Sequence, residues 1–548
     1  MSVLLLKGGR VADGERRTLE ALDVLVRDGV IEKVGKNLAS ADAEVVDCTG
    51  FVVTAGYIDA HVHVESGMVL PEAFGEAVLC QGTTAIIADP HEVVNVAGGE
   101  GLRLFMKMCD RSPADIFVSV PSCVPATPLD TNGAGKFLAA DMEEFVNDPR
   151  VVGLGEVMSF YDAAEGKPEI ADKIALFKRH DKTIDGHTSG MPEGLLDAYV
   201  AAGVENDHEC DSEAGMCARY EKGMNIYIRE GSAARNASEI LDGIKRRGLD
   251  ISRFAFCTDD KHLATIAKEG HISYIVAMAL EKGFSWGEAA AMASYNASRF
   301  YRLNDRGNVR AGLRADLVVA SPDARRTHLV LKNGEIAAVD QKSVIKYTEC
   351  DDEPLVFENT VEMRKFSAKD FVVPDRLKNV AIGLVDGQLL TEKAEVAESE
   401  RPNLLATAER YGRNGNLAVC FLKGYGIEDG AVATSVSHDS HNAVCAGSDG
   451  ENMAVALNRL SETGGGYVIA KGGKVIAELP MPAFGLMAVG GAEETARKID
   501  DMENLAHSMG VNRGVDAFTT LSFVALPVIP RLRLLDAGLY DTGEEKFL

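Results

Sequence analysis

The sequence lacks any arrangement of cysteines that would bind a structural metal or form a disulfide framework. Its ten cysteines are scattered over 548 residues, and no two of them form a C-x-x-C pair. Zinc ribbons need such pairs, and small secreted scaffolds need a much higher density of cysteine. We therefore interpret the thiols as reduced residues of a hydrophobic core.

Long apolar runs are also missing. The N-terminal apolar stretch is confined to Val3–Leu6 and is followed at once by Lys7 and two glycines. A signal peptide needs a longer apolar segment, and a membrane-spanning helix needs about 18 consecutive apolar residues, which occur nowhere in this chain. These absences predict a cytoplasmic protein that does not insert into a membrane.

Basic residues are scarce relative to acidic ones. Lys and Arg total 57 and Asp and Glu total 83, which gives a formal net charge of −26. This charge repels a phosphate backbone and therefore argues against a nucleic-acid partner. The sequence also lacks a Walker loop or dinucleotide fingerprint. Its glycine-rich segment SETGGGYV is not a phosphate-binding loop of that kind, because it leads into an expected strand rather than a helix. We expect a small neutral or cationic substrate.

The chain is long enough for more than one hydrophobic core. Two β-rich segments, one at the N-terminus and one after residue 304, resemble each other. In residues 1–55, Asp28-Gly29 separates two runs rich in Val and Ile, which is typical of a tight hairpin because both residues tolerate positive φ. Asn333-Gly334 has the same position in a second hairpin. We predict that residues 1–55 and 305–345 form one small β-sandwich.

Residues 56–304 alternate short buried strands with helical stretches, which is typical of a parallel sheet. Eight strands are predicted, at YIDAHVHVE, TTAIIADPHE, DIFVSVPS, VVGLGEVMS, KTIDGHTSG, GVENDHEC, MNIYIREGS and FAFCTDDKH. Eight β/α units in about 250 residues fit a TIM-like (β/α)8 barrel, whose active site lies at the carboxyl ends of the strands. A charged linker, KYTECDDEPLVFENTVEMRKFSAKDF, then leads into an additional C-terminal α/β domain within residues 346–548. The predicted fold class is therefore α/β.

Side chains of the kinds that bind metals stand at the ends of these strands. In GYIDAHVHVES, His61 and His63 point the same way along an extended strand, so both could bind one ion. Four more candidates follow later strands: Glu156, His187, His208 and Asp259. Each has an ordinary alternative, respectively a solvated carboxylate, a turn residue, an ion-pair partner of Asp207 and a helix N-cap. A barrel would gather all six at one mouth, where they suit two Mn, Fe or Zn ions better than Ca or Mg.

These motifs resemble those of a known superfamily. The GYIDAHVHVES entry, the histidines that follow the fifth and sixth strands, and TDD at the eighth look like the amidohydrolases. Glu156 stands where dihydroorotases, hydantoinases and ureases have a carboxylated lysine, which argues against those branches. The phrases DPHEVVNVAG, GEVMSF, DGHTSG, NDHE, CTDDKH, SHDSHN and MPAFGLM are closely similar to the bacterial and archaeal adenine deaminases, and the similarity extends over essentially the whole chain.

The resemblance implies a reaction in purine salvage, in which free adenine and water give hypoxanthine and ammonia. Water activated at a binuclear centre would attack the ring, and the metals would be Mn or Fe(II), with Zn as another possibility. One ion would be held by His61, His63 and Asp259, the other by His187 and His208, and both by Glu156. Asp259 would also carry the proton from the attacking water to the departing amine. The same resemblance implies a homo-oligomer, a dimer or larger.

Protonation of ring nitrogen N1 needs a further acid, for which the sequence offers Glu209 or the pair His91 and Glu92. The alternative for that pair is a loop-anchoring role. The candidates for substrate binding are His91, Arg229, Ser232 and Asp260, although an ion pair with Glu230 would explain Arg229 equally well. A second cluster, His438, Asp439 and His441, could reach over the barrel mouth or hold a polar turn.

Two rival interpretations remain. A binuclear hydrolase could act on another aminated heterocycle or a cyclic amide, or the barrel could persist as a non-catalytic scaffold. Deaminases that flip bases out of nucleic acid carry H-x-E with P-C-x-x-C, and the cysteine pair is absent here. We therefore expect the free base as the substrate.

Overall fold

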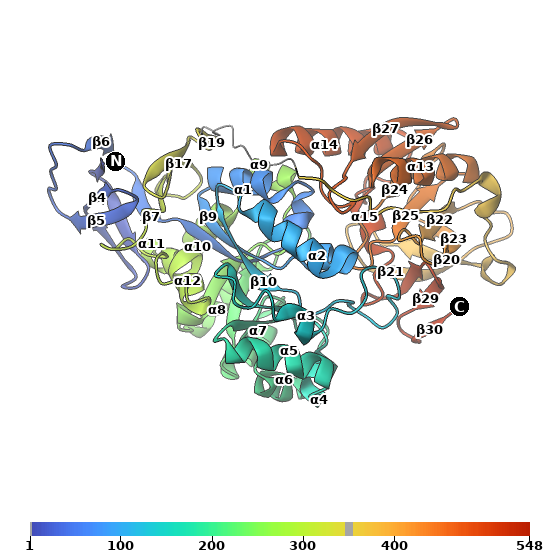
Figure 1. Cartoon of the computed structure of the whole chain (residues 1–548), viewed down its shortest axis with the longest axis horizontal. Coiled ribbons are helices and arrows are strands. Elements are labelled where there is room, and N and C mark those ends of the chain that lie inside the picture. The colour runs from blue at the N-terminus through green and yellow to red at the C-terminus, as the bar shows by residue number, and fades with distance from the viewer. Residues whose placement is uncertain (1–2, 346–354) are drawn as a thin grey trace.

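A computed structural model describes residues 3–345 and 355–548. The N-terminal strands lie at one end of the molecule, parallel strands with their helices occupy the middle, and the C-terminal sheet lies at the other end (Figure 1). Residues 346–354 of the predicted linker lie outside the described residues. None of the helices in the described part of the chain combines the length and the apolar character needed to cross a membrane.

Strands from both flanks of the middle segment share one sheet. This seven-stranded sheet has the order β19-β18-β17-β16-β7-β2-β3, and β7 pairs antiparallel with β16. Its strands are β2 (Arg10–Asp13), β3 (Thr18–Ala21), β7 (Val52–Ala55), β16 (Leu317–Ala320), β17 (Thr327–Lys332), β18 (Glu335–Val339) and β19 (Lys342–Ser343). A four-stranded sheet comes from the N-terminal segment alone: β1 (Val3–Lys7), β4 (Asp23–Arg27), β5 (Val30–Gly35) and β6 (Glu44–Asp47).

Both hairpins predicted from the sequence are confirmed. Asp28 and Gly29 have φ values of 50° and 82° and connect β4 to β5, with Arg27 opposite Val30. Asn333 and Gly334, with φ values of 52° and 76°, connect β17 to β18 in the same way. Two consecutive residues with positive φ match the twist of the flanking strands, which explains the choice of Asp, Asn and Gly.

All eight strands predicted between residues 56 and 304 are present. They are β8 (Tyr57–Val62), β9 (Thr83–Ala88), β10 (Asp115–Val120), β11 (Val151–Val157), β12 (Thr183–Gly186), β13 (Asn206–Asp207), β14 (Asn225–Arg229) and β15 (Phe254–Cys257). They pair in parallel as a five-stranded sheet, β12-β11-β10-β9-β8, and a three-stranded sheet, β13-β14-β15. The strands therefore do not form the single continuous ladder that a barrel prediction implies.

Polar side chains account for the interruption between β12 and β13. The Gly186 amide donates to Asn206 Oδ1 at 3.1 Å, and the Thr188 amide donates to Asp207 Oδ1 at 3.0 Å. The side-chain oxygens of Asn206 and Asp207 thus accept hydrogen bonds that backbone carbonyls would accept in a regular ladder of paired strands. At the opposite edge, a parallel bridge between Val62 and Asp259 joins the end of β8 to the segment after β15.

Amphipathic helices cover the parallel strands. They include α1 (Pro71–Cys80), α2 (His91–Cys109), α5 (Pro168–Arg179), α6 (Leu196–Ala202), α7 (Glu213–Glu221), α8 (Ala237–Arg247) and α10 (Ile272–Glu281). In α8, Ile240 and Ile244 are buried, and the last turn carries the basic run Lys245–Arg247, which complements the negative end of the helix dipole. Gly248, at φ 62°, then ends the helix in the left-handed conformation.

The C-terminal part is built on an eight-stranded sheet with the order β21-β20-β23-β22-β25-β24-β26-β27. Its strands are β20 (Val380–Leu384), β21 (Thr391–Glu395), β22 (Asn403–Ala408), β23 (Leu417–Lys423), β24 (Ala431–Thr434), β25 (Ala443–Gly447), β26 (Gly466–Lys471) and β27 (Lys474–Pro480). Helices α13 (Gly450–Thr463), α14 (Ala492–Ser508) and α15 (Thr519–Phe523) accompany it. The connection between β24 and β25, residues 435–442, carries the polar cluster noted in the sequence.

Candidate metal centre

The ends of β8 and β15 are held together by backbone hydrogen bonds. The Asp259 amide donates to the His61 carbonyl at 2.9 Å, and the His63 amide donates to the Asp259 carbonyl at 3.0 Å. Asp259 has a left-handed φ of 58°, a conformation that aspartate tolerates better than most residues. As a result, Asp259 Oδ1 lies 3.1 Å from His63 Nε2 and 3.8 Å from His61 Nε2. The H-x-H motif and the TDD motif therefore meet.

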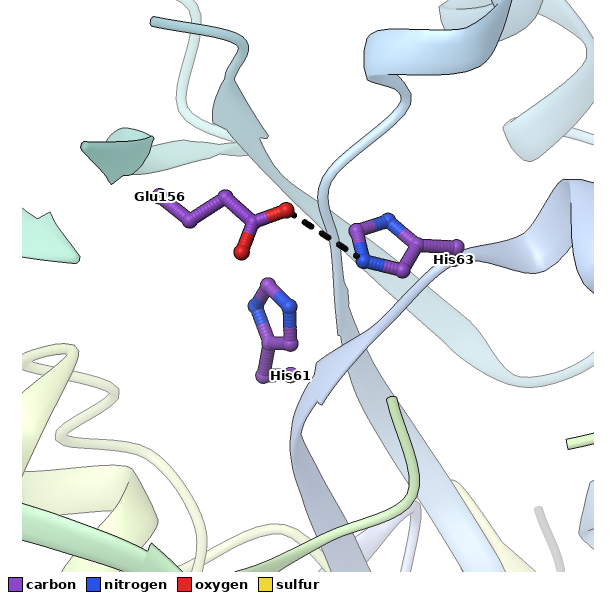
Figure 2. A group of neighbouring side chains, drawn as sticks. All are labelled: His61, His63 and Glu156. Atoms are coloured by element: carbon purple, nitrogen blue, oxygen red, sulfur yellow. Dashed lines mark ion pairs between the residues drawn. The ribbon is translucent and has the colours of Figure 1, made fainter. Parts of the chain in front are cut away.

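Glu156, near the end of β11, lies between the two sets of histidines. Its Oε1 is 3.6 Å from His63 Nε2 (Figure 2). Its Oε2 is 2.6 Å from His187 Nδ1 and 3.2 Å from His208 Nε2. The His61 and His208 rings stack with their centroids 4.1 Å apart. Six side chains from five strand ends are thus gathered in one cluster, with the Glu156 carboxylate between the other five.

The donor atoms are arranged as a metal-binding site requires. Possible ligand atoms lie within 4.8 Å of one another in the groups His61-His63-Glu156, Glu156-His187-His208 and His61-His208-Asp259. His61 Nε2 is buried without a hydrogen-bond partner in the described structure. His63 Nδ1 donates to the Asp89 carbonyl at 2.8 Å, which directs its Nε2 toward the Glu156 and Asp259 carboxylates, where it could bind an ion. The residues present therefore fit bound metal, and Glu156 belongs to two of the groups.

Burial and neighbouring charges set the protonation of these side chains. Burial alone would raise the pKa of Glu156, but His187 and His208 hold that pKa well below its usual range. Burial, together with His208 and His63, lowers the pKa of His61 well below its usual value. A carboxylate anion and a neutral imidazole are the forms in which these side chains bind metals.

Arg229 and Glu209 border the cluster. Arg229 donates to Asp259 Oδ2 at 2.8 Å and to both oxygens of Glu209, the longer of these contacts being 3.0 Å. The alternative partner, Glu230, is paired with Arg235 at 3.4 Å. Arg229 therefore faces the predicted site and fixes two of its carboxylates.

The remaining substrate-binding candidates are placed differently. Asp260 accepts a hydrogen bond from Ser66 and belongs to a possible ligand group with His63 and Asp259. Ser232 donates to Thr265 Oγ1 at 2.8 Å and accepts from the amide of His262 at 2.9 Å. These two bonds engage the Ser232 hydroxyl with the start of helix α9 (Leu263–Glu269).

His91 and Glu92 begin helix α2 beside the cluster. His91 Nδ1 lies 3.4 Å from Glu156 Oε1, and His91 Nε2 lies 3.3 Å from Glu92 Oε1. Glu92 also accepts hydrogen bonds from His438 Nδ1 and His441 Nε2. Burial disfavours a charged carboxylate here, yet His438, His441 and His91 hold the pKa of Glu92 well below its usual range. Two residues of the predicted second cluster, His438 and His441, therefore contact Glu92, and His91 lies between Glu92 and the metal-ligand cluster.

Known proteins match this chain over its full length. The profile of the amidohydrolase family matches residues 52–388, and that of the adenine deaminase C-terminal domain matches residues 384–546. The adenine deaminase of Desulfitobacterium hafniense (strain Y51) is 38% identical, covering 100% of this chain and 96% of its own length. That of Kosmotoga olearia is 36% identical with the same coverage. This chain belongs to the adenine deaminase family.

A third adenine deaminase, from Nitratidesulfovibrio vulgaris (strain DP4), is 39% identical over 94% of this chain and 91% of its own length. Among solved structures, a β-aspartyl dipeptidase from Fervidobacterium islandicum AW-1 aligns with a TM-score of 0.50 at 16% identity, covering 63% of this chain and all of that one. This likeness concerns the fold alone. The amidohydrolase family is metal-dependent, in agreement with the cluster of imidazoles and carboxylates.

Two buried carboxylates of this adenine deaminase family member were not singled out from the sequence. Asp89 Oδ2 accepts from the Glu156 amide at 2.8 Å, and its backbone carbonyl accepts from His63. Asp59 Oδ1 accepts from the amides of His61 at 3.2 Å and Thr258 at 3.1 Å. Both stand in the quoted phrases YIDAHVHVE and TTAIIADPHE. An ionisable residue within or directly after an apolar strand was the signal that could have found them.

Proposed function

We propose that this chain catalyses the hydrolytic deamination of free adenine to hypoxanthine and ammonia. The observation that carries the proposal is the cluster of six imidazoles and carboxylates that includes Glu156, in a chain that matches proteins named adenine deaminase from end to end. The reaction replaces the exocyclic C–N bond at C6 with a C–O bond and releases the amine as ammonia. The acidic charge of the chain agrees with a substrate that carries no phosphate.

Two divalent ions would be bound by the six side chains. We assign His61, His63 and Asp259 to one ion and His187 and His208 to the other, with Glu156 shared, and expect Mn or Fe(II). When bound, such ions supply a water of lowered pKa for attack on the ring. The shared position of Glu156, with one oxygen toward each histidine set, supports this assignment.

Asp259 is the proposed proton carrier. Its Oδ1 faces His61 and His63, whereas its Oδ2 accepts from Arg229. The hydrogen bond from His63 and the charge of Arg229 hold the pKa of Asp259 well below its usual range, and Arg229 fixes the direction of the carboxylate because it also binds Glu209. In this arrangement Asp259 can accept a proton from the attacking water and return it to the leaving amine. Glu209 is the proposed group that protonates ring N1: because the same arginine holds it as a carboxylate, it would first accept a proton from water and then pass that proton to N1.

His91 and Asp260 are the proposed contacts to the purine. His91 Nδ1 points toward Glu156 without a hydrogen-bond partner among the described residues. Asp260 lies beside the ligand group and is partly exposed. A small heterocycle offers only ring faces and edge donors or acceptors, so few polar contacts suffice to orient it.

We also propose how the chain is organised. Residues 56–304 would form a (β/α)8 barrel from the two parallel sheets, residues 1–55 and 305–345 the composite β-sandwich, and residues 346–548 the C-terminal domain. The backbone bridge between Val62 and Asp259 supports closure at one edge. The nine described cysteines carry free thiols, which supports a reducing, cytoplasmic location. We expect a homo-oligomer, which light scattering would detect.

The deciding experiment measures ammonia release by manganese-loaded protein from adenine, adenosine, cytosine and guanine, each tested alone, together with ring opening of dihydroorotate, whose hydrolysis releases no ammonia. Turnover of adenine alone is the expected result. Turnover of another member of the panel in place of adenine would assign a different heterocycle to the same site, and the absence of any turnover would favour the scaffold interpretation.

A further inference from the structure

The N-terminus of α2 contacts a distant loop of the C-terminal part. Glu92 accepts hydrogen bonds from His438 and His441, which lie 346 and 349 residues further along the chain. Glu92 and His441 are fully buried, and the His438 side chain is 14% exposed. A buried carboxylate is costly unless its oxygens accept hydrogen bonds, and here His438 and His441 supply them. Because breaking either bond would leave a buried charge without a partner, the contact holds the three side chains in place.

The ring of His441 has one orientation and one tautomer in this contact. Its Nδ1 accepts from the amide of Ser437 at 3.1 Å, so the neutral ring carries its hydrogen on Nε2. That Nε2 donates to Glu92 Oε2. His441 itself has a left-handed φ of 52°, which turns the loop back so that its amide reaches the Ser437 carbonyl at 2.6 Å. The local loop structure therefore aims the imidazole at Glu92.

His438 is held independently of His441. Its ring stacks on Phe523, with the centroids 4.6 Å apart, and its amide donates to the Ser522 carbonyl at 2.9 Å. Tyr411 supports the same loop by donating to the Ser440 carbonyl at 2.6 Å. The loop thus rests on two other elements of the C-terminal part before it meets Glu92.

Glu92 connects the two C-terminal histidines, His438 and His441, to His91. The carboxylate of Glu92 also lies 3.3 Å from His91 Nε2, so its oxygens are occupied by three imidazoles. The other nitrogen of His91, Nδ1, is buried, has no hydrogen-bond partner among the described residues and lies 3.4 Å from Glu156 Oε1. One side of His91 is therefore anchored, and the other faces the metal-ligand cluster.

We propose that His438 and His441 are positioning residues of the active site, which act through Glu92 to orient His91 toward the substrate. The C-terminal part thereby completes a site whose ligands all come from the parallel strands. Glu92 therefore orients His91. This role replaces our sequence-based hypothesis that Glu92 protonates ring N1. The inference rests on the proposed adenine deaminase function.

The test compares three variants of the metal-loaded full-length enzyme. His441→Phe removes the N–H donor, and we expect kcat on adenine to fall about 10- to 100-fold, the usual effect of losing a group that orients an active-site imidazole, with KM little changed. His441→Gln keeps a donor of similar reach and should recover most of kcat. His180→Gln, at an exposed position after α5, is the matched control and should behave as wild type.

A double-mutant cycle separates positioning from general stability. If His441 acts through Glu92, the loss in kcat for Glu92→Gln combined with His441→Phe should be smaller than the product of the two single losses. A purely structural role would lower the Tm and leave kcat unchanged well below the Tm, with no rescue by His441→Gln. That outcome overturns the inference but not the function. Wild-type protein that leaves adenine untouched overturns both.

Discussion

Glu156 is the residue at which the two sets of histidines meet. One carboxylate oxygen faces His63, and the other lies close to His187 and His208. The backbone around it is fixed as well, because the Glu156 amide donates to Asp89 and its carbonyl accepts from Ser122 Oγ at 2.6 Å. Such double anchoring suits a ligand shared between two ions.

Replacing Glu156 by Gln should weaken metal retention and activity together, each by at least about tenfold, because a neutral amide cannot replace the shared anion. Metal content after dialysis and adenine turnover would be measured on the same sample. Glu193→Gln, at an exposed position before α6, is the control and should match wild type. Full metal and full turnover in Glu156→Gln would disprove the shared role.

The pH dependence of stability can be tested at Asp130. Burial and the nearby Asp536 raise the pKa of Asp130 to about 6. Because the folded protein holds this proton more tightly than the unfolded chain, the free energy of unfolding is highest below about pH 4. It falls as the pH rises to about 6 and stays lower above that. Asn keeps an acceptor for the Thr127 hydroxyl and does not ionise.

Asp130→Asn should therefore gain stability relative to wild type as the pH rises from about 4 to 6, by up to about 3 kcal/mol. Denaturant unfolding of both proteins in the presence of a chelator, at several pH values, measures this difference. A difference that does not change with pH would contradict the assigned burial of the carboxyl.

At the scale of elements, local patterns predicted the strands and hairpins well. The Asp28-Gly29 turn and the eight strand positions follow from turn chemistry and apolar runs, which act over a few residues. The gathering of His61 with Asp259 follows from strand ends in parallel sheets. A reach of His438 and His441 over the barrel mouth was only one of two alternatives, and the contact of His441 with Glu92 could not be decided from the sequence, because it depends on how segments 349 residues apart pack.

The interruption between β12 and β13 also escaped the sequence patterns. Whether Asn206 and Asp207 point outward or take over backbone hydrogen bonds depends on the register of neighbouring strands. Likewise, Asp89 looks like any polar residue at the end of a strand until the Glu156 amide is placed beside it. Long-range geometry decides such roles, and local propensity does not contain it.

Gly155 in β11 tests the close packing beneath the site. A Cβ added there would lie 2.3 Å from Asp89 Oδ2, so Gly155→Ala must displace the carboxylate that anchors Glu156. We expect a stability loss of about 1–3 kcal/mol, as for other overpacked sites, together with lower metal retention. Gly194→Ala meets no heavy atom within 4 Å and serves as the control. Equal thermal melts and equal metal content in the two variants would show that Asp89 is not needed.

At the scale of the whole molecule, metal binding should couple to stability. The ligands come from strand ends distributed between β8 and β15, so ions would bind the folded chain and not the unfolded one. Removing metal with a chelator should lower the Tm by on the order of 5 °C, and added Mn should restore it. In Glu156→Gln, the difference in Tm between metal-loaded and metal-free protein should be smaller. Identical melts with and without metal would contradict the coupling.

The most direct test of the central claim is a metal titration of chelator-treated protein in which bound metal and hypoxanthine formation are followed together. We predict that adenine turnover is absent without metal and reaches its maximum at about two ions per chain, as a shared carboxylate requires. Full turnover by metal-free protein, or no turnover of adenine at full metal occupancy, would contradict the account.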